Sequence, residues 1–98
     1  MQNEQRYAVV ESVQFRRDRK RLKKAGRYNF EKLKLIVRML AAGNLLPEYC
    51  RDHPLKGDLA GTRECHVEGD WLLIYVRRED VLVLQLLRTG THSDLFGK

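Results

Sequence analysis

The chain has 98 residues, a formal net charge of +6 and two cysteines. This length allows one hydrophobic core, so we expect a single domain over residues 1–98. Cys50 and Cys65 form no CxxC pair, the first six residues lack the apolar centre of a secretory signal, and no apolar run approaches the roughly 20 residues that span a bilayer. We therefore expect a cytoplasmic protein with neither a disulfide framework nor a membrane partner.

The positive charge is concentrated in the first half of the chain. Residues 1–51 hold 13 of the 19 Lys and Arg side chains with five acids, whereas residues 52–98 hold six with eight acids. Eight of these cations lie between Phe15 and Arg27, with Asp18 as the single acid. Such a density suits a polyanion such as RNA, DNA or the surface of a ribosome. The alternative is a solvated helix face that only keeps the protein soluble.

The first half of the chain predicts a strand and then a helix. Residues 7–10 are short and partly β-branched, which is typical of a strand. Ser12 can cap a helix over residues 13–25, which carries a thin apolar stripe and charge on nearly all other faces, and Gly26 can end it.

A second predicted helix packs more extensively than the first. Asn29 is a suitable cap, and apolar residues recur at helical spacing from Phe30 to Ala41. The helix is expected to end at Gly43, with Pro47 beyond it. We expect its broad apolar face to pack against a sheet.

The second half of the chain predicts three consecutive strands over residues 62–67, 71–76 and 81–87. The second and third are apolar on both faces, which indicates central strands of an antiparallel meander. Thr91 and Asp94 form a capping-box pattern that would begin a short helical turn. The expected fold class is α+β, in the order β-α-α-β-β-β plus a C-terminal turn, with both helices packed on one face of a small, mainly antiparallel sheet.

All three histidines lie in polar segments near strand ends. His53 precedes Pro54 in a long connection and should therefore be extended. His66 and Asp70 flank the turn between the first two predicted strands, and His92 follows the third. Imidazoles and a carboxylate near basic charge are suited to RNA cleavage without a metal, because histidine can serve as acid, base or cationic phosphate ligand near neutral pH.

A metal site is the alternative use of the same side chains. Cys65, His66, Asp70 and His92 could all bind zinc. Their spacing matches no standard zinc pattern, and adjacent Cys65 and His66 point to opposite faces of a strand. We therefore expect no metal and no cofactor, with Cys65 in the core and His66 on the other face.

Two aromatic residues and one cation near the histidines each have two interpretations. Trp71 is either a core residue or a wall for a nucleobase. Phe96 either holds the tail to the core or lies one helical turn from His92 in the site. Arg88 is either a phosphate ligand or a surface ion-pair partner.

The polar segments of the second half resemble one known family. They are Asp52–Leu55 (DHPL), Gly61–Arg63 (GTR), His66–Trp71 (HVEGDW) followed by Leu-Leu-Ile-Tyr, and Arg88–Gly97 (RTGTHSDLFG). In order and spacing they resemble the YafQ-type toxins of the RelE/ParE superfamily, and the two-helix first half fits more loosely. The family often has Pro where this chain has Gly69.

This resemblance implies a RelE-like mRNA interferase toxin. Such a toxin would cleave translated mRNA on the ribosome through the 2′-hydroxyl and would be neutralised by a cognate antitoxin, with DNA contacted only through the antitoxin complex. The family's active-site set falls on His53, His66, Asp70, Trp71, His92 and Phe96. His92 would be the general acid, and Asp70 with His66 would form the base side. The phosphate would be held by His53, Arg88 and Arg63. The cations expected to contact ribosomal RNA are Arg16, Arg17, Lys20, Arg21, Lys23 and Lys24.

Two other functions use fewer of these residues. A non-catalytic ParE-like inhibitor of DNA gyrase would need no histidine cluster. A nucleic-acid-binding module without toxicity would need only the basic helix.

Overall fold

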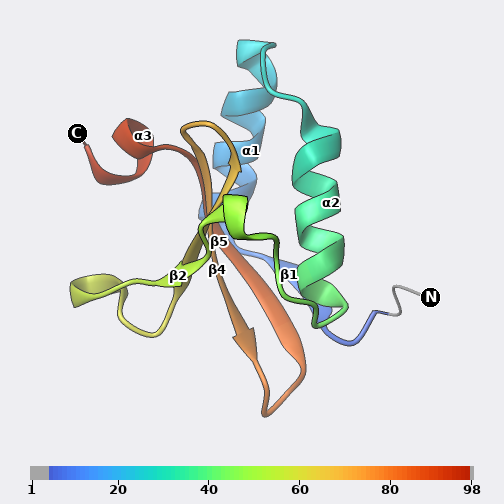
Figure 1. Ribbon diagram of the computed structural model, residues 1–98. Helices are drawn as coiled ribbons and strands as arrows, with labels where there is room; N and C mark the ends of the chain where they lie inside the picture. Colours follow the sequence, from blue (N-terminus) through green and yellow to red (C-terminus); the bar gives the residue numbers. More distant parts are fainter. Residues whose placement is uncertain (1–4, 98) are drawn as a thin grey trace.

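The computed structural model describes residues 5–97 and contains one five-stranded sheet in the order β1-β5-β4-β3-β2. Helices α1 and α2 run side by side, and α3 follows β5 (Figure 1). The elements are β1 (Ala8–Glu11), α1 (Val13–Ala25), α2 (Phe30–Ala41), β2 (His53–Pro54), β3 (Arg63–Glu68), β4 (Trp71–Arg78), β5 (Val83–Thr91) and α3 (His92–Phe96), with 3₁₀ turns at Glu48–Cys50 and Gly57–Leu59.

Both long helices begin where their capping residues predict, and α1 ends as predicted, whereas α2 ends at Ala41, before the expected Gly43. The side chain of Ser12 accepts a 2.9 Å hydrogen bond from the amide of Phe15, and Asn29 caps α2 through the amide of Glu31. Gly26 ends α1 in the left-handed conformation at φ 74°. The predicted order of elements and the α+β fold class are confirmed.

The sheet differs from the prediction at its edge and at one turn. A fifth strand, β2, pairs antiparallel with β3, and its two residues are too few to give a sequence pattern. Val81 and Leu82, predicted to begin a strand, lie instead in the β4–β5 turn, where both are exposed and Leu82 has φ 53°. Strand β1 pairs parallel with β5, whereas the other pairings are antiparallel.

The core lies between the two long helices and one face of the sheet. Leu33, Ile36 and Leu40 of α2 are buried against alternate residues of the central strands, including Leu73 and Leu84. Each such side chain contributes roughly 1.5 to 3 kcal/mol of burial free energy. The other face of β3 and β4, away from the two helices, carries the side chains that alternate with these core residues. Within residues 5–97, no helix is long and apolar enough to cross a membrane.

Candidate active site

His53 is held in an extended backbone at the sheet edge, as the following proline predicts. It lies opposite Glu64 in the β2–β3 pairing. Its Nδ1 is 2.7 Å from the carbonyl of Arg51, and its Nε2 is 3.8 Å from the carboxylate of Glu64. Because a carbonyl can only accept, Nδ1 carries the proton, and Nε2 is the nitrogen directed toward the carboxylate. About half of the imidazole remains exposed to solvent.

His66 lies on the sheet face opposite the core. Its neighbour Cys65 is fully buried in the core cluster, and successive strand residues alternate between faces. Nδ1 of His66 donates to the carbonyl of Gly69 at 2.9 Å, across the β3–β4 turn. The proton is therefore on Nδ1, and the Nε2 lone pair of the neutral ring is free to take a proton.

Asp70 and His92 meet where β4 begins and β5 ends. Trp71 pairs with Thr91, so the residues just outside this pair are neighbours. The amide of His92 donates to Oδ1 of Asp70 at 3.4 Å. The predicted capping box is present, with Thr91 and Asp94 bonded to each other's backbone amides. It orients the first turn of α3.

The strand register brings the histidines toward one end of the sheet. Leu72 pairs with His66 on one side and with Gly90 on the other, so the His66 and Gly90 backbones lie about 10 Å apart, two strand spacings. His53 lies one strand across from Glu64, which is two residues from His66 and on the same face. His53 and His66 therefore share the outer face of the sheet, and Asp70 and His92 lie at the end where β4 begins and β5 ends.

Phe96 lies one turn after His92 on α3, as predicted. The two ring centroids are 4.9 Å apart with an interplanar angle of 46°. The Phe96 ring is half-buried, and His92 is exposed. Phe96 therefore supports the imidazole directly.

The expectation that Trp71 stacks on a base is corrected by its burial. The indole is 2% exposed and packs edge-on against Tyr28 and Phe30, with centroids 5.0 and 5.5 Å away. Its Nε1 donates to the hydroxyl of Thr89 at 2.8 Å. Trp71 is a core residue that fixes β4 against α2 and β5 beneath the site, and offers no free ring face to RNA.

The two arginines predicted to hold phosphate are both bonded to carboxylates. Arg63 bonds Asp52 at 2.9 Å on the face shared with buried Tyr75, whose hydroxyl also donates to Asp52 at 2.6 Å. The structure does not bring Arg63 to His66, because Arg63 and His66 alternate across the strand. Burial and the hydrogen bond to Asp52 raise the pKa of Tyr75.

Arg88 is the ion-pair partner of a buried carboxylate on α1. It donates from Nε and Nη2 to Asp18 at 2.7 and 3.2 Å, and one third of its side chain is exposed. Asp18 is 2% exposed and also accepts from the amide of Thr89. The ion-pair interpretation of Arg88 therefore describes its contacts here.

The predicted ribosome-binding cations divide into two sets. A depression of about 450 Å³ on the exposed side of α1 is lined by Val13, Arg16, Arg17, Arg19, Lys20 and Lys23. Lys24 is also exposed. Arg21 lies apart from that depression and donates to Asp18 at 3.0 Å. The exposed side of α1 thus presents a basic surface, and Arg21 faces the body of the protein.

Sequence reasoning missed Glu64, the buried acid nearest to His53. Its side chain is 6% exposed although it lies on the face away from the core. Its spacing could have revealed it. Residues two apart on a strand share a face, and Glu64 is two residues before His66. Within residues 5–97, no group of three or more His, Cys, Asp and Glu side chains could hold a metal ion.

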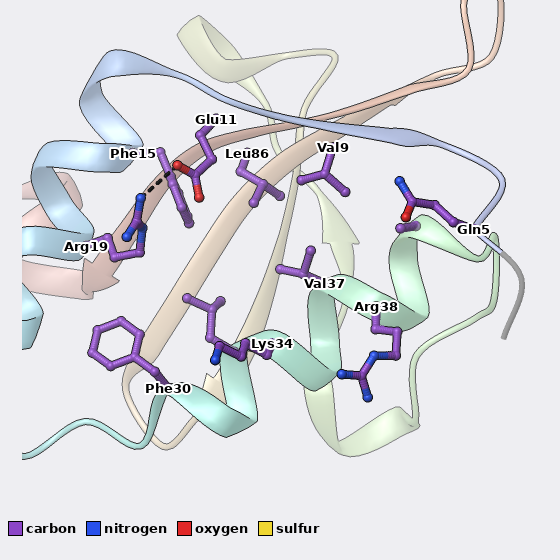
Figure 2. Close-up of a pocket in the computed structure, with 12 residues that line it drawn as sticks. Gln5, Val9, Glu11, Phe15, Arg19, Phe30, Lys34, Val37, Arg38 and Leu86 are labelled. Atoms are coloured by element: carbon purple, nitrogen blue, oxygen red, sulfur yellow. Dashed lines mark hydrogen bonds and ion pairs between the residues drawn. The ribbon is translucent and has the colours of Figure 1, made fainter.

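A separate groove of about 600 Å³ lies between β1, α1 and α2 (Figure 2). Val9, Phe15, Leu33 and Val37 contribute apolar side chains to its lining. Arg19, Lys34 and Arg38 add positive charge, and Arg19 pairs with Glu11 at 2.8 Å. None of the candidate catalytic side chains lines this groove, so the groove and the candidate catalytic side chains are in different places.

Comparison with known proteins agrees with this fold. The family described as bacterial toxin of type II toxin-antitoxin system, YafQ, matches residues 7–97. The mRNA interferase toxin YafQ of Escherichia coli strain B / BL21-DE3 is 41% identical over 87 residues, which cover 88% of this chain and 91% of the relative. The crystal structure of YafQ from E. coli BL21(DE3) superposes with a TM-score of 0.85 at 38% identity, covering 93% of this chain and 99% of that one.

The fold and the family match define a bacterial toxin of a type II toxin–antitoxin system. The chain belongs to the YafQ toxin family. The resemblance found in the sequence is therefore confirmed, and the predicted enzyme class, an endoribonuclease, agrees with the names of the curated relatives. A further solved relative, the E. coli DinJ–YafQ toxin–antitoxin complex, has a TM-score of 0.84 at 38% identity and covers 94% of this chain and 99% of its own.

Proposed function

We propose that this toxin is a ribosome-dependent endoribonuclease that cleaves translated mRNA in the cytoplasm by acid–base catalysis through the ribose 2′-hydroxyl. The observation that carries the proposal is the meeting of His92 with Asp70 beside His66 at one end of the sheet. Positioned acid and base groups each contribute about 10² to 10⁴ in rate, so one acid and one base together would accelerate RNA cleavage substantially.

The free nitrogen of His66 makes it the base side of the reaction, together with Asp70. Nδ1 of His66 is committed to the Gly69 carbonyl, so Nε2 is the group that takes the 2′-hydroxyl proton. The alkoxide then attacks the adjacent phosphorus and displaces the 5′-oxygen, which leaves a 2′,3′-cyclic phosphate. His92, exposed at the start of α3, gives its proton to that leaving oxygen.

His53 is assigned to the phosphate. Its Nε2 lies 3.8 Å from the Glu64 carboxylate, and about half of the imidazole is exposed to solvent, where a phosphate oxygen can reach it. A cation at this edge can neutralise the charge that develops on the phosphate oxygens. Arg88 can add to this role through the exposed third of its side chain, whereas Arg63 lies on the other face.

The basic surface of α1 is assigned to ribosomal RNA. One depression is lined by Arg16, Arg17, Lys20 and Lys23. Among residues 5–97, none of those that line it is acidic. Neutralising several phosphates makes such binding steeply dependent on salt. Contact with the ribosome would present the message to the small site in a fixed orientation, which lowers the entropic part of the barrier.

A cognate antitoxin is the second expected partner. The E. coli relative has been solved as a DinJ–YafQ toxin–antitoxin complex. We assign this chain a corresponding partner, expressed with it, that suppresses cleavage. In this system DNA would be contacted through the antitoxin complex only.

The test compares the native chain with His53→Ala and His92→Ala. Both variants should lose toxicity and cleavage of ribosome-bound message, and both should still bind the antitoxin and unfold at the native temperature. Full cleavage by either variant contradicts the assignment. DNA-damage signalling on expression with intact messages would instead identify a gyrase inhibitor, and harmless expression without antitoxin would identify a simple binding module.

A further inference from the structure

Arg21 lies between two carboxylates that come from opposite ends of the chain. Its Nη1 is 3.0 Å from Oδ1 of Asp18 on α1, and its Nη2 is 3.4 Å from Oδ2 of Asp94 on α3. Half of the Arg21 side chain is exposed, as is one third of Asp94. The guanidinium therefore bridges the basic helix and the turn that carries His92.

The backbone beneath this bridge leaves no room for a side chain. A Cβ added at Gly90 would lie 2.9 Å from Oδ2 of Asp94 and 3.0 Å from Nη2 of Arg21. Gly90 also has φ 154°, which L side chains rarely adopt. The glycine thus allows the Arg21–Asp94 pair to pack directly on the end of β5.

The anchor of the bridge is rigid. Asp18 is 3% exposed and is fixed by Arg88 and by the amide of Thr89, so it has little freedom to move when Arg21 is removed. Burial alone would raise the pKa of Asp18, but the hydrogen bonds from Arg88, Thr89 and Arg21 outweigh it and hold the pKa below its ordinary value. The carboxylate therefore stays charged for Arg21 at neutral pH.

The other end of the bridge needs support. Helix α3 has five residues, fewer than the 12 to 15 at which even favourable isolated helices become marginal in water. Its other contacts include the capping box at Thr91, the 3.4 Å contact of the His92 amide with Asp70, and the half-buried side chains of Leu95 and Phe96. Arg21 adds the link to the body of the protein.

We propose that Arg21 is a positioning residue for His92, acting through Asp94, and is distinct in role from the other α1 cations. This inference rests on the proposed function, in which His92 is the general acid. It assigns Arg21 to the rate of the chemical step and leaves Arg16, Arg17, Lys20 and Lys23 with ribosome binding.

The test measures single-turnover cleavage of ribosome-bound message over a range of toxin concentrations. Arg21→Gln and Asp94→Asn should each lower the maximal rate roughly tenfold and leave the half-saturating concentration unchanged, because a small displacement of a catalytic group has a large effect on rate. Asparagine at 94 can still accept from the Thr91 amide, so the cap is retained while the ion pair is lost. The double variant should be no slower than either single one.

Lys20→Gln is the matched control, since it removes the neighbouring charge on the exposed side of α1. It should raise the half-saturating concentration and leave the maximal rate unchanged. If Arg21→Gln behaves as Lys20→Gln does, Arg21 is a phosphate contact and the proposal is wrong. The proposal is also wrong if Asp94→Asn cleaves as fast as the native chain.

A second measurement separates this proposal from the nuclease assignment. The amides of Asp94 and Gly97 are bonded to Thr91 and Ser93 within α3, and their hydrogen exchange can be followed in the toxin without RNA. Exchange at both should be several-fold faster in Arg21→Gln than in Lys20→Gln. Equal exchange would overturn the link between α1 and α3 whatever reaction the toxin performs.

Discussion

The backbone N–H of His92 donates a 3.4 Å hydrogen bond to Oδ1 of Asp70, although the two residues are 22 positions apart. The contact joins the β3–β4 turn to the first residue of α3, because Trp71 and Thr91 pair at the ends of their strands. His66 reaches the same turn through the carbonyl of Gly69. The groups assigned to acid and base are therefore held by one set of strand pairings.

Replacing Asp18 by Ala should be strongly destabilising. The carboxylate is 3% exposed and pairs with Arg88, so its loss leaves a half-buried guanidinium without a partner. Removing one member of a buried pair costs roughly 3 kcal/mol or more in the free energy of unfolding. Urea denaturation measures this, with Asp80→Ala as the control, because Asp80 pairs with Arg78 on the exposed β4–β5 turn. A native-like midpoint for Asp18→Ala would contradict the role given to this residue.

Acid should unfold the native chain more steeply than the Asp18→Asn variant. The folded-state pKa of Asp18 is lowered, since its hydrogen bonds outweigh the effect of burial. A lowered pKa contributes stability that is present above the unfolded value, about 3.9 for Asp, and is lost as pH falls through the folded value. The free energy of unfolding should therefore fall below about pH 4 in the native chain and less so in the variant. The variant keeps part of this pH dependence, because the pKa of Asp94 is also lowered in the folded chain.

The fluorescence of the single tryptophan should be insensitive to RNA. Trp71 is 2% exposed and bonded to Thr89, so its emission should be that of a buried indole and should shift to longer wavelength only on unfolding. Adding an RNA with 2′-O-methyl groups, which cannot be cleaved, should leave both emission and acrylamide quenching unchanged. Strong quenching by this RNA would mean that the indole becomes available for stacking.

Glu64→Gln should slow cleavage without unfolding the protein. The buried carboxylate lies 3.8 Å from Nε2 of His53, so the variant removes the carboxylate that faces the imidazole assigned to phosphate. We expect a loss of roughly tenfold in cleavage rate, less than that expected for a proton-transferring group. The control is Glu68→Gln on the same strand, an exposed acid paired with Lys32. Equal rates for both variants would remove Glu64 from the site.

Much of the fold could be predicted because it rests on local signals. Ser12, Gly26 and Asn29 fix helix ends through their own backbone geometry, and the alternation around Cys65 places His66 on the outer face. Strand β2 could not be predicted, since two residues have no period. It exists because β3 offers an edge beside an extended His53.

The site was only partly predictable because side-chain partners come from distant segments. Arg88 is bonded to Asp18, 70 positions away, and no local pattern reveals this pairing. Trp71 is adjacent to Asp70, but strand alternation sends its indole to the core face with Leu73. Proximity in sequence therefore left two interpretations open for Trp71 and for Arg88, and the structure shows the first as a core residue and the second as an ion-pair partner.

The most direct test of the central claim is the mapping of transcript 5′ ends after brief expression of the native chain, His92→Ala and the exposed-charge control Glu31→Ala. The account predicts new 5′ ends within translated regions for the native chain and for Glu31→Ala, and none for His92→Ala at equal protein level. The same new ends in the His92→Ala sample, or intact messages in a growth-arrested culture that expresses the native toxin, would contradict it.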